Sequence, residues 1–239
     1  MSFDEIRLLI ASLLVGILLL VAIGRIFRKK LPIFDSKYIA RTAVFAAISI
    51  ILYVVPIFQF KLPFFPAFLE IHVDEIPALI AGFAYGPTSG VIVILLKTLV
   101  KLPFTSTAGV GELADLIYSI AFVFPSALVY KKMHSIKGAL VALLVGTLVQ
   151  ILTSSFGTTF IMLDVYSVLY KLPKEAILGM CKAVNPRITD LRWPFFFYVG
   201  LPFNALKDAI VVVVTLLLYK RLHGLLDRIS NKMSTKKLG

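Results

Sequence analysis

The chain has 239 residues, of which 59% are apolar and 16% charged, and its mean hydropathy is +0.93. This composition excludes an ordinary soluble domain and is typical of a protein with several membrane-spanning helices. The formal net charge of +12 does not indicate nucleic-acid binding, because the basic residues lie in short clusters beside apolar segments.

Seven apolar segments approach the length needed to cross about 30 Å of hydrocarbon. In chain order, the predicted helices cover residues 6–27, 38–57, 74–85, 89–103, 111–130, 138–162 and 195–222. The third segment is short for a full crossing, so a broken or tilted hairpin around Gly86 and Pro87 is an alternative there. We expect an all-α polytopic membrane protein.

The first segment could be mistaken for a secretory signal peptide. Asp4 and Glu5 precede its apolar run, whereas a signal peptide begins with positive charge, and basic residues instead of a cleavage site follow it. We therefore expect a retained transmembrane helix.

Basic residues cluster after the first, fifth and seventh segments, and the positive-inside rule places such clusters in the cytoplasm. Seven crossings bring all three clusters to the same side, with the N-terminus outside and the C-terminus in the cytoplasm. We expect a multi-pass protein of the cell membrane with an extra N-terminal helix (residues 1–30), a membrane domain (31–224) and a basic cytoplasmic tail (225–239). The clusters comprise Arg25, Arg28, Lys29, Lys30, Lys37 and Arg41; Lys131, Lys132 and Lys137; and Lys220, Arg221, Arg228, Lys232, Lys236 and Lys237.

Two long connections, residues 58–73 and 163–193, are rich in proline and aromatic residues and are predicted to lie on the outer side. Connections of this length are usually functional. The second is predicted to hold a short surface helix that ends near Asn185 and Pro186.

Ionisable residues inside the predicted spans are functional-site hypotheses, because each costs several kcal/mol at mid-membrane depth. They are Lys97, Glu112, Asp115, Lys207 and Asp208. The alternative is that these charges only neutralise one another or extend to the membrane interface.

The segment "PFNALKDAIVVVV" places Asn204, Lys207 and Asp208 on one face of the last helix. An amide both donates and accepts hydrogen bonds, and an ammonium donates them. The pair formed by Asn204 and Lys207 would suit an uncharged heteroaromatic ligand with imide-like edges. The alternative is an ion pair between Lys207 and a nearby carboxylate.

Two further regions supply polar candidates. The loop from Thr105 to Glu112 lies between two spans, and irregular backbone at membrane depth is tolerated where it lines a wet cavity or is buried in protein. Lys97 either faces this pocket or is neutralised by Glu112 and Asp115. Thr158, near the outer end of the sixth span, is a ligand candidate, although membrane-helix hydroxyls usually bond backbone or a neighbouring helix.

Several motifs are absent from the sequence. There is no P-loop, so another subunit must supply the ATPase if transport is driven by ATP. There is no Cys/His cluster with metal-ligand spacing and no recognisable catalytic motif, and the single Cys181 cannot form an intramolecular disulfide. We expect no enzymatic activity, no metal and no cofactor.

The segment "FLEIHVDEIPALIAGFAYGPTSGVIVILLKTLVKLPFTSTAGVGELADLI" (residues 68–117) resembles the substrate-binding S components of energy-coupling-factor (ECF) vitamin transporters, most of all the riboflavin-specific branch. A second match is the family's P-F-N-x-x-K pattern, found at Pro202, Phe203, Asn204 and Lys207. The resemblance covers about residues 38–222. The sequence departs from the family at two places. Asp115 stands where an asparagine is common, and the sixth span has Ser155, Gly157 and Thr158 near its outer end, where the family often carries a ring-contacting asparagine.

The resemblance implies a six-helix S-component core, outside which the extra first helix lies. It implies high-affinity riboflavin capture on the outer side under residues 58–73, with Leu69, Glu70 and Ile71 as contacts, and delivery inward by reorientation in the membrane. It also implies assembly with a membrane T component and two cytoplasmic ATPases. Ala43 and Ala47, small residues four apart on the second span, are the expected docking face.

Within this resemblance, Asn204 and Lys207 would bind the flavin ring, and the region from Thr105 to Glu112 would bind the ribityl hydroxyls. Three alternatives stay open. They are an S component for pantothenate or a thiamine precursor, an ion-coupled secondary transporter with Glu112, Asp115 and Asp208 as a proton relay, and a membrane scaffold without a ligand. Unpaired Lys97 or Lys207 would favour an anionic ligand.

Overall fold

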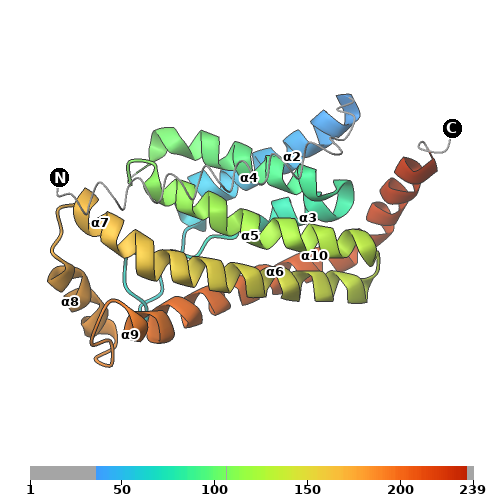
Figure 1. Ribbon diagram of the computed structural model, residues 1–239. Coiled ribbons are helices and arrows are strands. Elements are labelled where there is room, and N and C mark those ends of the chain that lie inside the picture. Colours follow the sequence, from blue (N-terminus) through green and yellow to red (C-terminus); the bar gives the residue numbers. More distant parts are fainter. Residues whose placement is uncertain (1–35, 106, 236–239) are drawn as a thin grey trace.

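The computed structural model describes residues 36–105 and 107–235, with side chains up to residue 221. The predicted first crossing (residues 6–27) lies outside the described residues. The long helices lie side by side in one elongated bundle (Figure 1). The helices are α2 (Ser36–Val54), α3 (Glu75–Tyr85), α4 (Pro87–Lys101), α5 (Val110–Lys132), α6 (Ile136–Gly157), α7 (Leu163–Leu169), α8 (Lys174–Val184), α9 (Trp193–Phe195) and α10 (Leu201–Thr235).

Four short turns of other helix types connect or extend these helices. Two are 3₁₀ turns, η1 (Pro56–Phe58) and η2 (Leu102–Phe104). The other two are π-helical turns: η3 (Thr158–Met162) joins α6 to α7, and η4 (Phe196–Gly200) joins α9 to α10. Helices α6 and α10 therefore each have a locally wider segment near the same end of the bundle.

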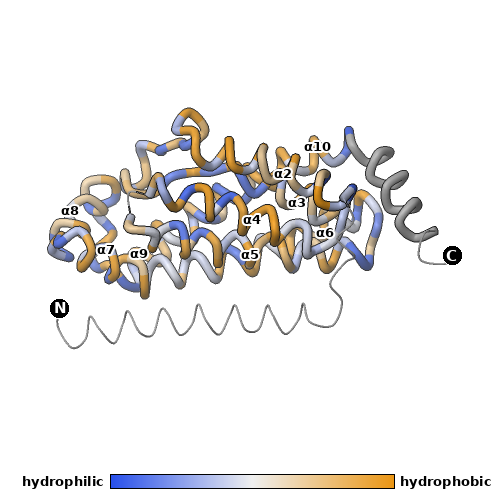
Figure 2. The backbone as a smooth tube through the Cα atoms, turned by 90° about the horizontal axis from the view of Figure 1, so that it is seen from above, coloured by the Kyte–Doolittle hydropathy of each residue, from blue (hydrophilic) through white to orange (hydrophobic). Residues whose placement is uncertain are grey.

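Five described helical segments are long and apolar enough to cross a membrane, and α3 is a shorter apolar helix. The second to seventh predicted spans are thus all helical, with boundaries shifted by a few residues. Hydrophobic stretches run along these helices (Figure 2). The predicted surface helix before Asn185 is confirmed as α8.

Helix α3 is short because the connection before it folds into the bundle. Phe60 and Ile71 form an antiparallel bridge with N–O distances of 3.1 and 2.8 Å, and Ile71 is buried. The hydroxyl of Ser49 on α2 donates to the carbonyl of Asp74 at 2.6 Å. Asp74 and Glu75 are consequently buried, so the helix begins inside the protein instead of at its surface.

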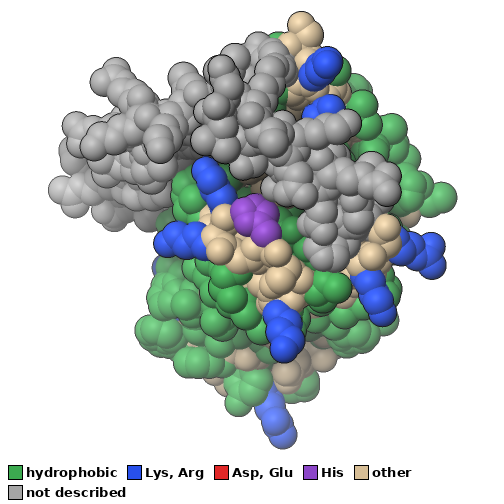
Figure 3. Space-filling model, turned by 90° about the vertical axis from the view of Figure 1, so that its right-hand side faces the viewer, with side chains coloured by type: hydrophobic (Ala, Val, Ile, Leu, Met, Phe, Trp, Pro, Cys, Tyr) green, Lys and Arg blue, Asp and Glu red, His purple; other side chains and the backbone are tan. Residues whose placement is uncertain are grey.

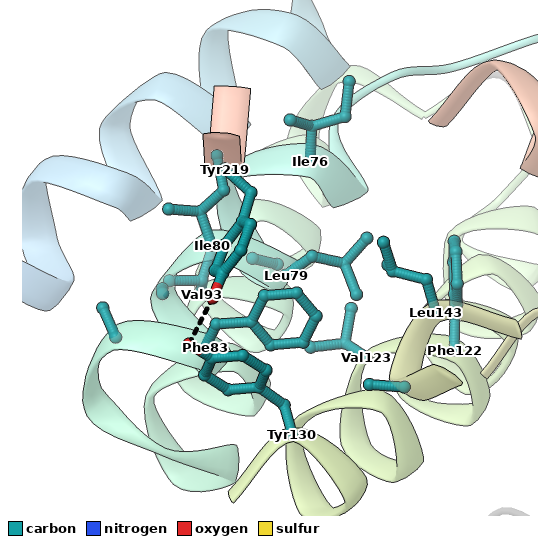
Figure 4. Close-up of a cluster of buried hydrophobic side chains, with 14 of the residues drawn as sticks. Ile76, Leu79, Ile80, Phe83, Val93, Phe122, Val123, Tyr130, Leu143 and Tyr219 are labelled. Carbon is teal, nitrogen blue, oxygen red and sulfur yellow. Dashed lines mark hydrogen bonds between the residues drawn. The ribbon is translucent and has the colours of Figure 1, made fainter. Parts of the chain in front are cut away.

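The core is centred on α3, which packs against α4, α5, α2 and α10. Figure 4 shows Leu79 and Phe83 of α3 among side chains from the surrounding helices. The Phe83 ring stacks on Tyr130 with a centroid distance of 4.4 Å, and the hydroxyls of Tyr130 and Tyr219 are hydrogen-bonded at 2.7 Å. This contact ties α5 to α10 at one end of the bundle.

Exposed basic residues gather at that end, where α5 turns into α6 and α10 leaves the bundle (Figures 1 and 3). The predicted basic clusters thus share one end of the protein as far as the structure describes them. The short helices α7, α8 and α9 lie at the opposite end (Figure 1). The exposed basic residues at the first end are Lys37, Arg41, Lys131, Lys132, Lys137, Lys220 and Arg221.

Helices α5 and α6 pack closely together at Gly146 of α6. A Cβ on Gly146 would lie 2.6 Å from the carbonyl oxygen of Phe122 and 1.9 Å from the hydroxyl of Ser126. We predict that Gly146→Ala lowers the free energy of unfolding by about 1–3 kcal/mol, the usual cost of overpacking. Thermal unfolding of the purified protein in detergent measures this change.

The matched control is Gly179→Ala on α8, where a Cβ meets no atom within 4 Å. Alanine favours a helix over glycine by roughly 0.5–1 kcal/mol, so this variant should be as stable as the wild type or slightly more stable. Equal stability of the two variants would contradict the close packing of α5 on α6.

Candidate binding site

A cavity lies between the helices toward the end that carries α7, α8 and α9. Its wall combines the connection before α3 with one face of α5, the two π turns and the first turns of α10. The spacing of Gly111, Ala114, Asp115 and Tyr118 places one helical face of α5 against it. The lining residues are Phe68, Leu69, Glu70, His72, Gly111, Ala114, Asp115, Tyr118, Thr158, Met162, Tyr166, Phe195, Gly200, Phe203, Asn204 and Lys207.

Aromatic side chains dominate this wall, and a few polar groups are set among them. Phe68 and Phe195 stack at a centroid distance of 6.4 Å, and Phe203 contacts Phe65 edge-on at 5.2 Å. Such a mixture of flat apolar surfaces and few polar groups is usual for small-molecule sites. The cavity therefore suits a ligand with a planar ring system and several polar edges.

Asn204 reaches the cavity with its amide held in place. The Asn204 nitrogen donates to the carbonyl of Gly200 at 2.8 Å and to the hydroxyl of Ser155 at 3.2 Å. These two bonds use the nitrogen side of the amide and fix its plane. The amide oxygen is then the side of Asn204 suited to accept a hydrogen bond from a ligand.

Lys207 lies one helical turn beyond Asn204, and its ammonium is paired. The Nζ atom is 2.6 Å from Oε1 of Glu75, at the start of α3, and both side chains are buried. An ammonium has three donors, and this contact uses one of them. Lys207 can therefore donate to a ligand without being an unpaired charge.

Lys97 occupies the centre of a second buried group of charges. Its ammonium contacts the carboxylate of Asp74, lies 2.9 Å from that of Asp115 and donates to the Ser119 hydroxyl at 3.1 Å. The ammonium also lies 4.4 Å from the centre of the Tyr53 ring. Lys97 is thus paired within the protein, and its partner Asp115 is the member of this group that lines the cavity.

The two ion-paired groups are connected, because Ser119 also lies within 3.4 Å of Glu75. With all members ionised, the two lysines face three carboxylates, which gives a formal charge of −1. Among the described residues that line the cavity, Lys207 is the basic side chain other than His72. The site therefore offers hydrogen-bond donors without an excess of positive charge.

The structure brings five of the predicted ligand residues to the cavity wall and places the other five elsewhere. Ile71 packs behind the wall, and Glu112 accepts hydrogen bonds of 2.7 Å from Thr105 and Thr107. Asp208 is buried, and neither of its carboxylate oxygens has a hydrogen-bond partner in the described part of the chain. The residues at the wall are Leu69, Glu70, Thr158, Asn204 and Lys207; those elsewhere are Ile71, Lys97, Thr105, Glu112 and Asp208.

Sequence reasoning did not select several residues of the wall, including His72, Tyr118, Met162 and Tyr166. Tyr118 could have been found from its helical spacing to Asp115. Met162 and Tyr166 follow the π turn, whose effect on side-chain direction has no sequence signal. Ala43 and Ala47, the expected docking face, are exposed on α2.

These features define a membrane-embedded binding protein: a helical bundle with an aromatic cavity and polar groups that are internally neutralised. Residues 37–219 match the family of the substrate-specific components of ECF transporters. The chain belongs to this family, which confirms the resemblance drawn from residues 68–117 and the P-F-N-x-x-K pattern.

Two characterised relatives and a solved structure resemble most of the chain. The riboflavin transporter RibU of Staphylococcus aureus (strain TCH60) is 28% identical over 202 residues, which are 84% of this chain and 98% of the relative. The riboflavin transporter FmnP of Bacillus subtilis (strain 168) is 29% identical over 187 residues, 77% of this chain and 92% of the relative. A structure of the S component of a bacterial ECF transporter matches with a TM-score of 0.61 and 27% identity, over 80% of this chain and 97% of that one.

His72, in the connection before α3, gives the site a pH dependence. Burial lowers the pKa of His72 to about 4; the negative charge of Asp115 has a smaller raising effect, and the positive charge of Lys207 a smaller lowering one. The unfolded chain takes up this proton near pH 6.5, so stability is lost as the pH falls from about 6.5 toward 4. We predict a loss on the order of 3 kcal/mol over this window, measured as unfolding of the ligand-free protein in detergent.

The control is His72→Gln, which keeps a polar side chain that does not titrate. The fall in stability between pH 7 and pH 4.5 should be smaller in this variant than in the wild type. If both proteins lose stability equally, another group causes the acid sensitivity.

Proposed function

We propose that this chain is the riboflavin-binding S component of an ECF-type importer. The observation that carries the proposal is the pairing of Lys207 with Glu75 beside the held amide of Asn204. This arrangement presents a donor and an acceptor on one helical face without an unbalanced positive charge. The relatives named for riboflavin transport support the same ligand.

The chemistry of the flavin ring fits this face. Its pyrimidine-like edge has one N–H between two carbonyl groups, which is complementary to an amide oxygen flanked by donors. Asn204 would accept from the N–H, and Lys207 would donate to a ring carbonyl or nitrogen. The aromatic wall formed with Phe195 and Phe203 would cover the apolar part of the ring.

The ribityl chain needs several hydroxyl partners at the other side of the cavity. We assign this role to Asp115, Thr158 and Glu70, which line the cavity. Thr105 and Glu112 would then act by shaping the loop before α5, since they are hydrogen-bonded to each other at 2.7 Å. Asp208 and Lys97 would not contact the ligand and would support the site from behind the cavity wall.

The proposal includes the assembly that the family implies. The chain would work with a membrane T component and two cytoplasmic ATPases, and would dock through the α2 face that contains Ala43 and Ala47. It would capture the vitamin outside the cell under residues 58–73, with Leu69 and Glu70 at the cover and Ile71 buried behind them, and release it inward. Riboflavin is then a transported ligand, and the chain has no catalytic step or cofactor of its own.

The first test of this proposal is the absorption spectrum of the protein purified from cells grown with riboflavin. We predict a yellow wild type with a flavin band, and a large loss of bound flavin in Asn204→Ala. A wild type that is colourless and does not quench the fluorescence of added riboflavin would remove riboflavin as the ligand.

Lys207 needs a separate design, because removing one partner of a buried ion pair typically costs about 3–5 kcal/mol of stability. The double variant Lys207→Met with Glu75→Gln removes both charges, and it should fold while binding riboflavin weakly. Thr153→Ala is a matched control for Asn204→Ala, since the Thr153 hydroxyl bonds the Val149 carbonyl on the exposed side of α6. This control should bind riboflavin like the wild type.

Charge pairing also predicts the selectivity of the site. Riboflavin should bind at least about tenfold more tightly than FMN or pantothenate, since an anion would enter a group of charges that is already formally negative. Competition for quenching of riboflavin fluorescence measures the ratio. Tighter binding of pantothenate would instead favour the alternative vitamin, and would contradict the pairing as the source of selectivity.

A further inference from the structure

A third group of charges lies outside the cavity wall, where α7, α8 and α9 meet. The buried carboxylate of Asp164, on α7, is 2.8 Å from Nη2 of Arg192 and 2.7 Å from Nζ of Lys174. Lys174 begins α8, and Arg192 immediately precedes α9. One carboxylate therefore binds both ends of residues 174–192, which comprise α8 and the turn that follows it.

Arg192 makes contacts with the π turn η3 that Lys174 does not share. Its Nη1 atom lies 3.4 Å from the carbonyl oxygen of Thr159 and 3.5 Å from that of Phe160. The guanidinium carbon is also 5.8 Å from the centre of the Phe160 ring. A planar guanidinium can serve carbonyls and a carboxylate at once, which a lysine ammonium does with much less geometric control.

The turn that Arg192 contacts also forms part of the cavity wall. Thr158 and Met162, its first and last residues, line the cavity, and Tyr166 lines it from α7. A π turn adds one residue to a helix, and each residue of an α-helix rotates the side-chain direction by about 100°. Whether η3 keeps this geometry therefore decides which side chains of α6 and α7 face the ligand.

We propose that Arg192 is a positioning residue of the binding site. It holds η3 in its π geometry from outside the cavity, so that Thr158, Met162 and Tyr166 face the bound ligand. Asp164 orients the guanidinium for this task, and Lys174 only adds to the charge balance of Asp164. The inference deepens the proposed function, because its binding measurement uses riboflavin as the probe.

The experiment compares Arg192→Gln with Lys174→Gln, since each removes one cation from Asp164 but only the first removes the contacts to η3. Riboflavin dissociation, followed by the recovery of its fluorescence, should be about tenfold faster in Arg192→Gln, as for loss of one charge-assisted hydrogen bond. Dissociation from Lys174→Gln should stay within about twofold of the wild type. Equal acceleration in both variants would overturn the proposal, because it would reduce Arg192 to a general anchor of the connection.

A ligand-independent measurement accompanies the binding test. Amide hydrogen exchange of residues 158–166 in the ligand-free protein should be faster in Arg192→Gln and unchanged in Lys174→Gln. Arg192→Lys, which keeps the charge beside Asp164, should lie between the wild type and Arg192→Gln, and it serves if Arg192→Gln does not fold. Unchanged exchange in the Arg192 variants would overturn the positioning role, whereas a wild type that binds no riboflavin would overturn only the proposed function.

Discussion

The burial of two lysine ammonium groups among three carboxylates is the constraint on which the rest of the bundle depends. Lys97 and Lys207 come from different helices, and their partners Asp74 and Glu75 are consecutive residues at the start of α3. Because an isolated charge is very costly in a membrane, the helices must meet where these groups can neutralise one another. Ser119 connects the two pairs and links α5 to the same point.

The binding site is a consequence of this arrangement. Because the lysines are paired with carboxylates, their charge does not attract anions to the cavity. Lys207 and Asp115 still line the cavity and can form hydrogen bonds with a ligand. Of the aromatic wall, Phe68 and Phe195 come from segments without these charges, whereas Tyr118 and Phe203 share α5 and α10 with Asp115 and Lys207. The charge balance of the site and part of the shape of the cavity therefore depend on the same helix contacts.

The membrane made much of the fold predictable, since crossing hydrocarbon requires long apolar helices and makes every buried charge conspicuous. Asn204, Lys207 and Asp115 were found in this way. The pairing of Lys97 with Asp115 was also among the alternatives drawn from the sequence. The partners Asp74 and Glu75 were not found, because they lie at the start of a predicted span. Their burial results from a connection that folds inward, which depends on contacts such as Ser49 with Asp74. The π turns also escaped prediction, since no residue pattern specifies the added residue.

The bridge between Phe60 and Ile71 divides the connection before α3 into two mechanically different parts. On the side of the bridge nearer to α2 and α3, hydrogen bonds of the Gln59 and Ser49 side chains hold the chain against α2, and the chain leads directly into the ion pairs. On the other side of the bridge, residues 61–70 carry the ion pair of Lys61 and Glu70, at 3.1 Å, and are held mainly by the rings of Phe65 and Phe68 against Phe203 and Phe195. Displacement of this segment would separate aromatic contacts and leave the buried ion pairs intact, since Asp74 and Glu75 lie beyond the bridge.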